Sequence, residues 1–273
     1  MLLDSRERPP AATFPPMSAA SADRTPRRSE AAPLTRGSAV RLVGAGVLLY
    51  LALAGVGLLI THLPQDSWLV RMDRQASQWF AAHRTPTLNT LTHYGTLLSE
   101  TYTAIALSIA LVLLMRWWLG RWRESIGVAV AILGELFVFL LVTNTVDRAR
   151  PPVPHLDAAP PTSSFPSGHT AAAVALYGCL AVIVLRQLAN RWAAWTIALL
   201  CCCVPPIVGI SRVYRGMHYP SDVVFGAIGG GIWLLVTVLV VVPPATYGRR
   251  GTRAASSPRP RPAPSSHRGA LAR

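Results

Sequence analysis

Long uninterrupted runs of apolar residues fill the middle of the chain. Six of these runs are long enough to cross a hydrocarbon core about 30 Å thick, since an α-helix rises about 1.5 Å per residue. The runs cover residues 40–61, 98–115, 125–145, 169–188, 193–211 and 221–243. This pattern predicts an all-α fold, an integral membrane bundle of six transmembrane helices.

Residues 65–95, between the first two runs, have a different pattern, in which apolar and polar positions alternate at helical spacing. The apolar positions are Trp68, Leu69, Met72, Ala76, Trp79 and Phe80. A segment with one apolar and one polar face is typical of a helix that lies in the membrane interface. We therefore expect an interfacial helix after the first span.

Both ends of the chain lack apolar periodicity and are rich in Pro, Ser, Ala and Arg. Segments of this composition do not bury enough apolar surface to become ordered. We expect residues 1–38 to form a disordered cytoplasmic tail, residues 39–244 the membrane domain, and residues 245–273 a disordered basic tail. The first long apolar run begins near Val40, which argues against a cleaved signal peptide.

Composition supports a membrane protein and helps to orient it. Apolar residues make up 51% of the chain and charged residues only 14%, which is low for a soluble domain. All 26 cationic side chains are Arg, and the net charge is +14. Because these arginines gather in the tails and in short loops beside apolar runs, they favour membrane topology over nucleic acid binding. Cytoplasmic termini place most of them inside the cell.

Three polar clusters lie at span ends that this topology places on the outer face. They are VDRARPP (146–152), FPSGHT (165–170) and SRVYRGMHYPSD (211–222). Together they bring guanidinium groups, two imidazoles, a carboxylate, a hydroxyl and a helix N-terminus to one face of the membrane. Guanidinium groups and helix N-termini both bind phosphate oxygens. The clusters therefore predict a phosphate site.

The phosphate contacts are assigned to Arg150, Arg212 and Arg148 on the first and third clusters. Ser167 and Gly168 precede the fourth span, so that backbone N–H groups and the positive helix end point at the anion. Gly168 also permits a close approach of the backbone. The alternatives are that the arginines are interfacial anchors and that Ser167 is a simple N-cap.

The two histidines divide the expected chemistry. Pro220 fits the first turn of the sixth helix, so Asp222 can accept the N–H of the His218 imidazole and leave its other nitrogen free. An oriented neutral imidazole is a competent nucleophile toward phosphorus. His169 would protonate the leaving oxygen and then activate water. The alternative for Asp222 is a helix cap.

Other polar residues have weaker assignments. Glu135 lies in the middle of the third run, where a charge costs about 2.5–3.5 kcal/mol on insertion scales. It is either a protonated packing residue or part of a polar path. His155 and Asp157 lie in a proline-rich loop, and neither they nor the cysteines have metal-ligand spacing, so no metal or cofactor is predicted. Arg215 is either a substrate contact or a solvated loop residue.

The three clusters resemble the motifs of the type 2 phosphatidic acid phosphatase superfamily, which shares its phosphate site with vanadium haloperoxidases and bacterial acid phosphatases. That family's pattern is a Lys followed by Arg-Pro, then Pro-Ser-Gly-His, then Ser-Arg with a His and an Asp. The matching residues are Arg150, Pro151, Pro166, Ser167, Gly168, His169, Ser211, Arg212, His218 and Asp222. The likeness covers roughly residues 40–243.

The resemblance implies a role for each matched group. His218 would form a phosphohistidine, Asp222 would orient it, and His169 would act as acid and base. The phosphate would be held by Arg150, Arg212, Ser167 and Gly168. The resemblance also implies six spans, a metal-independent mechanism and an outward-facing site.

One position departs from the family pattern. The family's Lys lies seven residues before the Arg of Arg-Pro, and this chain has Thr143 there. A hydroxyl group does not supply the lost charge. Arg148 lies nearby on the same stretch, and we expect it to take over part of the role.

The sequence thus predicts a lipid phosphate phosphatase in the cell membrane, with lipid phosphate as its partner. It would hydrolyse a phosphomonoester or diphosphate, such as phosphatidic acid or polyprenyl diphosphate, at the outer leaflet. One alternative is a phosphotransferase that passes the same phosphate to an acceptor other than water. The other is a six-span transporter or an inactive scaffold, which the loss of the family Lys favours and the intact histidines oppose.

Overall fold

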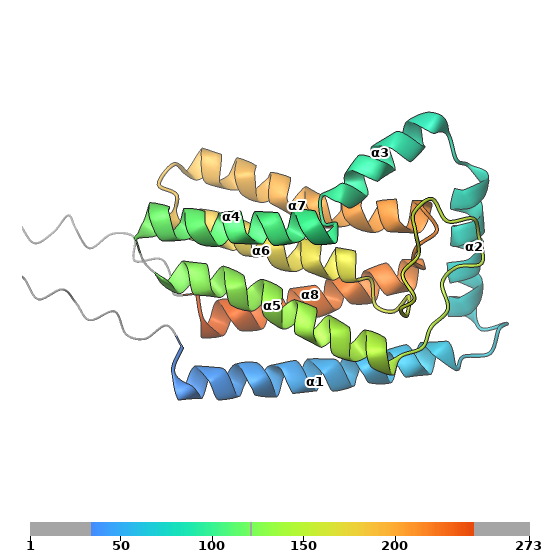
Figure 1. Ribbon diagram of the computed structural model, residues 1–273, viewed down its shortest axis with the longest axis horizontal. Helices are drawn as coiled ribbons and strands as arrows, with labels where there is room; N and C mark the ends of the chain where they lie inside the picture. Colours follow the sequence, from blue (N-terminus) through green and yellow to red (C-terminus); the bar gives the residue numbers. More distant parts are fainter. Residues whose placement is uncertain (1–33, 121, 243–273) are drawn as a thin grey trace, which may run out of the picture. The chain divides into compact units, whose positions relative to one another are not determined.

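The computed structural model describes residues 34–120 and 122–242, and within them every regular element is a helix (Figure 1). The helices are α1 (Arg36–Thr61), α2 (Trp68–Ala82), α3 (Pro86–Leu97), α4 (Thr101–Leu119), α5 (Trp122–Thr145), α6 (Gly168–Gln187), α7 (Arg191–Tyr214) and α8 (Pro220–Val240). The predicted all-α fold is confirmed.

Six of these helices, α1 and α4 to α8, are long and apolar enough to cross a membrane. They coincide with the six predicted spans, with ends that differ by a few residues. The shifts arise where polar residues cap the helices: Glu100 accepts the N–H of Tyr102 before α4, and Asn190 accepts that of Ala193 before α7. Such caps satisfy terminal N–H groups and do not register in a search for apolar residues.

The predicted interfacial helix over residues 65–95 is two helices, which corrects that expectation. The break falls at Thr85, whose hydroxyl accepts the N–H of Leu88 at 3.2 Å and so caps α3. Pro86 follows as the first residue of α3, where its missing N–H costs nothing. The Thr-Pro pair ends one helix and starts the next.

The predicted tails lie mostly outside the described residues. Within the described part, α1 begins at Arg36, inside the expected N-terminal tail. The start follows from a cap at Thr35, whose hydroxyl accepts the N–H of Ser38 at 3.1 Å.

Helix α6 has the most buried sequence of the six and packs against α5, α7 and α8. Its contact with α8 is unusually close. A Cβ atom on Gly226 of α8 would lie 2.5 Å from the Ser167 carbonyl oxygen, and one on Gly230 would lie 2.7 Å from that of Ala171. Backbone therefore packs directly on backbone where α6 begins.

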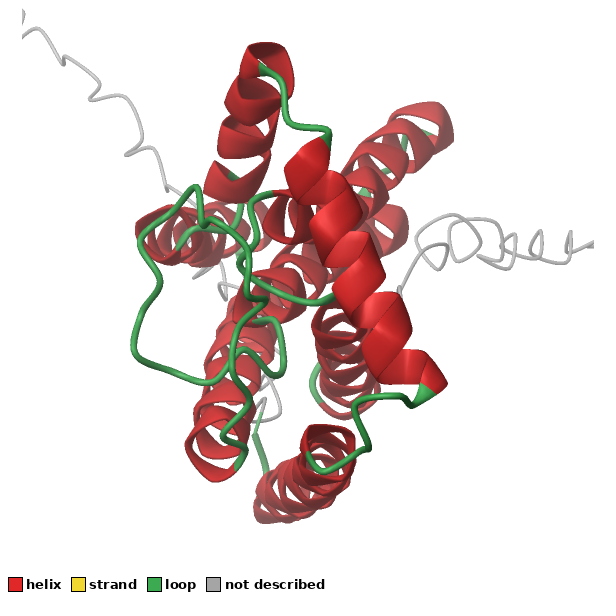
Figure 2. Cartoon of the chain, turned by 90° about the vertical axis from the view of Figure 1, so that its right-hand side faces the viewer, coloured by secondary structure: helices red, strands yellow, loops and turns green. Residues whose placement is uncertain are grey.

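The first residue of α1 and the last of α8 lie at one end of the bundle, and the loop over residues 146–167 lies at the other (Figure 1). We call this second end the site end. Helix α2 crosses it, nearly perpendicular to the spans, as the view onto that end shows (Figure 2). It packs against α7 and α8. All three polar clusters lie at the site end.

Candidate active site

The three polar clusters are in direct contact. The Ser164 N–H donates to the Arg148 carbonyl at 2.9 Å, which joins the first cluster to the segment that leads into the second. The Arg150 Nη1 donates to the Met217 carbonyl at 2.7 Å and joins the first cluster to the third. The Ser167 N–H donates to the Asp222 carbonyl at 3.0 Å and joins the second to the third. The predicted convergence is therefore present.

His218 is buried, with only 4% of its surface exposed, and its ring has one defined partner. Its Nδ1 lies 2.7 Å from the carbonyl oxygen of Ser164. Since a carbonyl oxygen only accepts hydrogen bonds, Nδ1 carries the proton and Nε2 keeps its lone pair. Burial lowers the pKa of His218, the Asp222 carboxylate opposes this shift, and the charge of Arg212 adds to it. His218 is thus held as an oriented neutral imidazole.

Asp222 does not accept the His218 N–H, contrary to the expectation from spacing. Its Oδ2 lies 3.8 Å from Nδ1 and instead accepts the backbone N–H of Tyr219 at 2.8 Å, which caps α8. Its Oδ1 accepts from Arg148. The fully buried carboxylate therefore acts on His218 through its charge and through the shape of the helix start.

Arg148 also differs from its predicted role in the phosphate grip. Its Nη1 donates to Asp222 and, at 2.8 Å, to the Ser221 hydroxyl, while its Nη2 donates to Asp73 at 2.8 Å. Its guanidinium group lies over the Tyr219 ring, 4.4 Å from the centroid. Both terminal nitrogens are occupied by protein groups, so Arg148 is part of the supporting framework.

Arg150 and Arg212 are different, because each has a buried Nε without a partner among the described residues. Their Nη1 atoms are anchored, that of Arg150 to Met217 and that of Arg212 to the Thr96 hydroxyl at 3.0 Å. Burial lowers the pKa of Arg150, and the Asp222 charge opposes that shift. Buried donors without partners are rare in folded proteins, and an anion would satisfy both.

The start of α6 supplies the remaining predicted groups. Ser167 stands at the N-cap, but its hydroxyl pairs with that of Thr170 at 2.9 Å and makes no cap hydrogen bond. The N–H groups in the first turn of a helix have no partner within it, so those of α6 are directed to the site end. His169 is half-buried in this turn, and Ser99 donates to its carbonyl at 2.8 Å.

Two carboxylates of the site were not predicted. Asp157 accepts from Arg212 at 3.2 Å and from Arg215 at 2.6 Å. Burial acts to raise the pKa of Asp157, but the Arg215 hydrogen bond and the charges of Arg215, Arg212 and His93 together hold it below its ordinary value. Arg215 is thereby a buried framework residue. Two arginines three residues apart at the end of α7, Arg212 and Arg215, were the available signal for a buried acid.

The second carboxylate is Asp73 of α2, which is 1% exposed. Its sequence signal was its position within the apolar stripe of an amphipathic helix, four residues after Leu69 and three before Ala76. A charge at such a position is buried only when a partner compensates it. That partner is Arg148.

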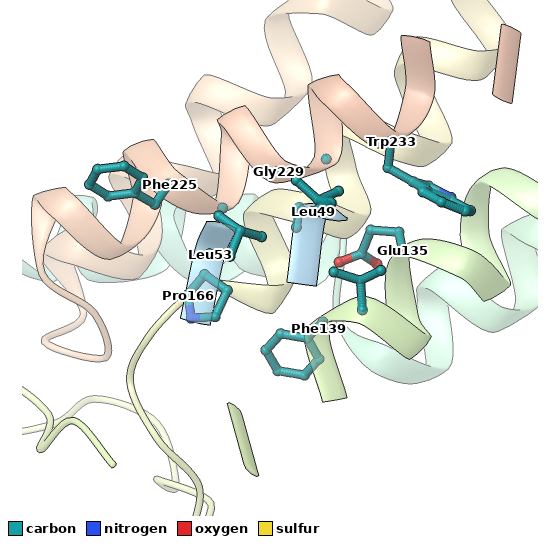
Figure 3. A pocket seen from close by; sticks show the side chains of 12 residues that line it. Leu49, Leu53, Glu135, Phe139, Pro166, Phe225, Gly229 and Trp233 are labelled. Carbon is teal, nitrogen blue, oxygen red and sulfur yellow. The ribbon is translucent and has the colours of Figure 1, made fainter. Parts of the chain in front are cut away.

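Two hollows adjoin these residues. A groove lies between the end of α5 that is nearest the site and the following loop, and its lining includes Thr143, Asn144, Arg150 and Thr162. A small hollow, with room for about one water molecule, lies next to Pro166 (Figure 3). Glu135 faces this hollow beside Trp233, and its Oε1 has no partner among the described residues.

Six long apolar helices define a multi-pass membrane protein. At one end it has an oriented imidazole and two guanidinium donors without a partner among the described residues, which make a candidate anion site. The chain belongs to the PAP2 superfamily, whose sequence profile matches residues 97–243, more than half of the chain.

The chain is similar to curated proteins of that kind. It is 30% identical over 132 residues to the lipid A 1-phosphatase of Rhizobium etli, a match that covers 45% of this chain and 50% of the relative. It is 28% identical over 144 residues to the undecaprenyl-diphosphatase BcrC of Bacillus subtilis, which covers 49% of this chain and 69% of the relative. The chain thus spans about half the length of the first relative.

Solved structures share the fold. The transmembrane PAP2 type phosphatidylglycerolphosphate phosphatase of Bacillus subtilis superposes with a TM-score of 0.61 at 22% identity, over 72% of this chain and 94% of that one. The LpxE structure of Aquifex aeolicus superposes with a TM-score of 0.50 at 21% identity, over 65% of this chain and 99% of that one.

Proposed function

We propose that this protein is a membrane phosphatase that hydrolyses a lipid phosphomonoester or diphosphate through a phosphohistidine on His218. The observation that carries the proposal is the state of that ring. Its Nδ1 is bound to the Ser164 carbonyl at 2.7 Å, its Nε2 is left as a nucleophile, and the charges of Arg212 and Arg150 act on it. A phosphate beside this ring would satisfy the unpartnered Nε donors of both arginines.

The reaction then has two steps. In the first, the His218 Nε2 forms a bond to phosphorus, the bond from phosphorus to the lipid oxygen breaks, and His169 protonates that oxygen. In the second, His169 takes a proton from water, the water oxygen bonds to phosphorus, and the bond from phosphorus to the His218 Nε2 breaks, which releases inorganic phosphate. Arg150, Arg212 and the N-terminus of α6 stabilise the negative charge that develops on the phosphate oxygens.

The location of the site favours lipid substrates. It lies at the end of the bundle, beside the groove next to Arg150, so a head group would reach it while the lipid tail stays among the spans. The names of the relatives point to the same substrate class, namely lipid A carrying a 1-phosphate, undecaprenyl diphosphate and phosphatidylglycerolphosphate. We place both termini in the cytoplasm and the site on the outer face.

Purified protein tested against a panel of lipid phosphates is the direct experiment, with released phosphate as the readout. We expect release in the presence of a chelator, because the proposed steps use the imidazoles of His218 and His169 and the charges of Arg150 and Arg212. His218→Ala should abolish release and also the acid-labile phosphoenzyme, whereas His83→Ala, an exposed histidine at the same end, should leave both unchanged. Equal release by wild type and His218→Ala would refute the mechanism.

The same experiment separates the alternatives. Phosphate recovered on an added alcohol or sugar, at the expense of free phosphate, would indicate a phosphotransferase. The open groove beside Arg150 is large enough to admit an acceptor. If no lipid phosphate is hydrolysed and no phosphoenzyme forms on His218, a transporter or an inactive scaffold would be favoured.

A further inference from the structure

Asp73 links the helix that crosses the site end to the framework behind the nucleophile. It lies on α2, but both of its carboxylate oxygens accept hydrogen bonds from segments that are distant in the sequence. Oδ1 accepts the backbone N–H of Ser221 at 3.0 Å. Oδ2 accepts from the Ser221 hydroxyl and, at 2.8 Å, from Arg148. Asp73 therefore holds the first turn of α8 directly.

Arg148 extends this link to Asp222. Its guanidinium group lies between the two carboxylates, with Nη2 on Asp73 and Nη1 on Asp222. All three side chains are buried, with 1%, 8% and 0% of their surface exposed for Asp73, Arg148 and Asp222. Two carboxylates share one guanidinium, so the group of three carries a net negative charge. Water is excluded from it, and its charge is therefore weakly screened.

We propose that Asp73 is a positioning residue for the His218 nucleophile, an inference that rests on the proposed function. Asp222 lies 3.8 Å from the His218 ring nitrogen, and Asp73 fixes Asp222 through Arg148 and Ser221. The net negative charge also has a role, because the imidazole becomes positive as Nε2 bonds to phosphorus. A nearby negative charge stabilises that state.

Loss of the Asp73 charge has two consequences. The Arg148 guanidinium is left with a single carboxylate partner, so the Arg148–Asp222 pair is free to shift relative to the His218 ring. The group of three becomes neutral and no longer stabilises the positive imidazole. Both effects act on the chemical step, and neither removes a group that contacts the phosphate.

Asp73→Asn in the full-length protein is the test, with the lipid phosphate on which the wild type is most active. We expect kcat to fall about 10- to 100-fold, the range typical for loss of a partner that orients a metal-ligating side chain, with KM changed less than about threefold. The rate of phosphoenzyme formation in a single turnover should fall by the same factor as kcat. Thermal unfolding in detergent reports on folding.

Ser77→Ala is the matched control. Ser77 is equally buried one turn along α2, and its hydroxyl donates to the Asp73 carbonyl at 2.8 Å, inside the helix. Its loss removes a hydrogen bond within α2 without touching the link to Asp222, so kcat should stay within about twofold of wild type. Arg148→Lys keeps the charge but offers one ammonium in place of a two-armed group, and its kcat should lie between wild type and Asp73→Asn.

The outcomes distinguish this inference from the proposed function. Wild-type kcat in Asp73→Asn beside an inactive His218→Ala would overturn the inference alone, as would equal losses in Asp73→Asn and Ser77→Ala. Activity retained by His218→Ala would overturn both. If Asp73→Asn does not fold, Ser221→Ala takes its place, since it removes one hydroxyl contact of Asp73 and keeps the backbone one. Full phosphoenzyme formation in that variant would also overturn the inference.

Discussion

Arg148 and Arg150 are two residues apart, yet their guanidinium groups bind different partners. Arg148 is enclosed by Asp73, Asp222 and Ser221, whereas Arg150 keeps a buried Nε without a partner among the described residues. Only the second arrangement leaves a donor for substrate. Because the family's Lys is Thr143 here and both terminal nitrogens of Arg148 are occupied by protein groups, we propose that Arg150 and Arg212 hold the phosphate.

Arg150→Lys and Arg212→Lys should each lower kcat/KM about 10- to 100-fold. Each change keeps the charge but removes the Nε donor, and a hydrogen bond to a charged group contributes about 1.5–3 kcal/mol. Steady-state kinetics on the preferred lipid phosphate measure the effect. Arg71→Lys, at an exposed position of α2, serves as the control, and a similar decline in that variant would contradict the assignment.

The pH dependence of kcat/KM should reflect the environment of His218. Only the neutral imidazole attacks phosphorus, and burial lowers the pKa of this group below its ordinary value near 6.5. Activity should therefore persist as the pH falls through about 6.5 and decline only at lower pH. A pH profile with a buffer series of constant ionic strength measures this. An acidic midpoint at or above 6.5 would contradict a depressed pKa.

At the scale of elements, the close contact between α6 and α8 holds the second and third polar clusters together. Gly226 makes this possible, because any side chain there would meet the Ser167 carbonyl oxygen at 2.5 Å. The same region carries the hydrogen bond from the Ser167 N–H to the Asp222 carbonyl. The distance between these helices therefore sets the distance between the start of α6 at Ser167 and the proposed nucleophile His218.

Gly226→Ala should destabilise the protein by about 1–3 kcal/mol, the usual cost of overpacking, and lower kcat by displacing Ser167. Gly231→Ala on the same helix is the control, since a Cβ there meets nothing within 4 Å and alanine favours helix by up to about 1 kcal/mol. Thermal unfolding and kcat of the pair are the measurements. Equal melting temperatures for the two variants would refute the close-contact argument.

At the scale of the molecule, six spans place the beginning of α1 and the end of α8 at the end opposite the site (Figure 1). From the arginine distribution we propose that the site faces outward. A lipid phosphate in the outer leaflet would then have its head group on the same side of the membrane as the site.

Cysteine labelling in intact cells tests that orientation. In a variant without the four native cysteines, Asp66→Cys at the site end should react with a membrane-impermeant maleimide added outside. Ala189→Cys, in the exposed connection between α6 and α7 at the opposite end, should react only after the cells are permeabilised. The reverse pattern would place the site in the cytoplasm.

The length of the apolar runs was sufficient to predict six spans, because the hydrocarbon core imposes one length on every crossing helix. The positions of VDRARPP, FPSGHT and SRVYRGMHYPSD at span ends were likewise sufficient to predict that the three clusters meet at one end of the bundle. The break at Thr85 was missed, although its Thr-Pro pair was visible in the sequence.

The partners of the hydrogen bonds and ion pairs were not predictable in this way. Spacing favoured a hydrogen bond from His218 to Asp222, but the His218 N–H donates instead to the carbonyl of Ser164, which is 54 residues away. Likewise, Arg148 forms an ion pair with Asp73. Asp73 lies on α2, and the sequence did not predict where α2 packs. Hydrogen bonds and ion pairs depend on atoms brought within about 3 Å, and the packing of α2, α6 and α8 sets those distances.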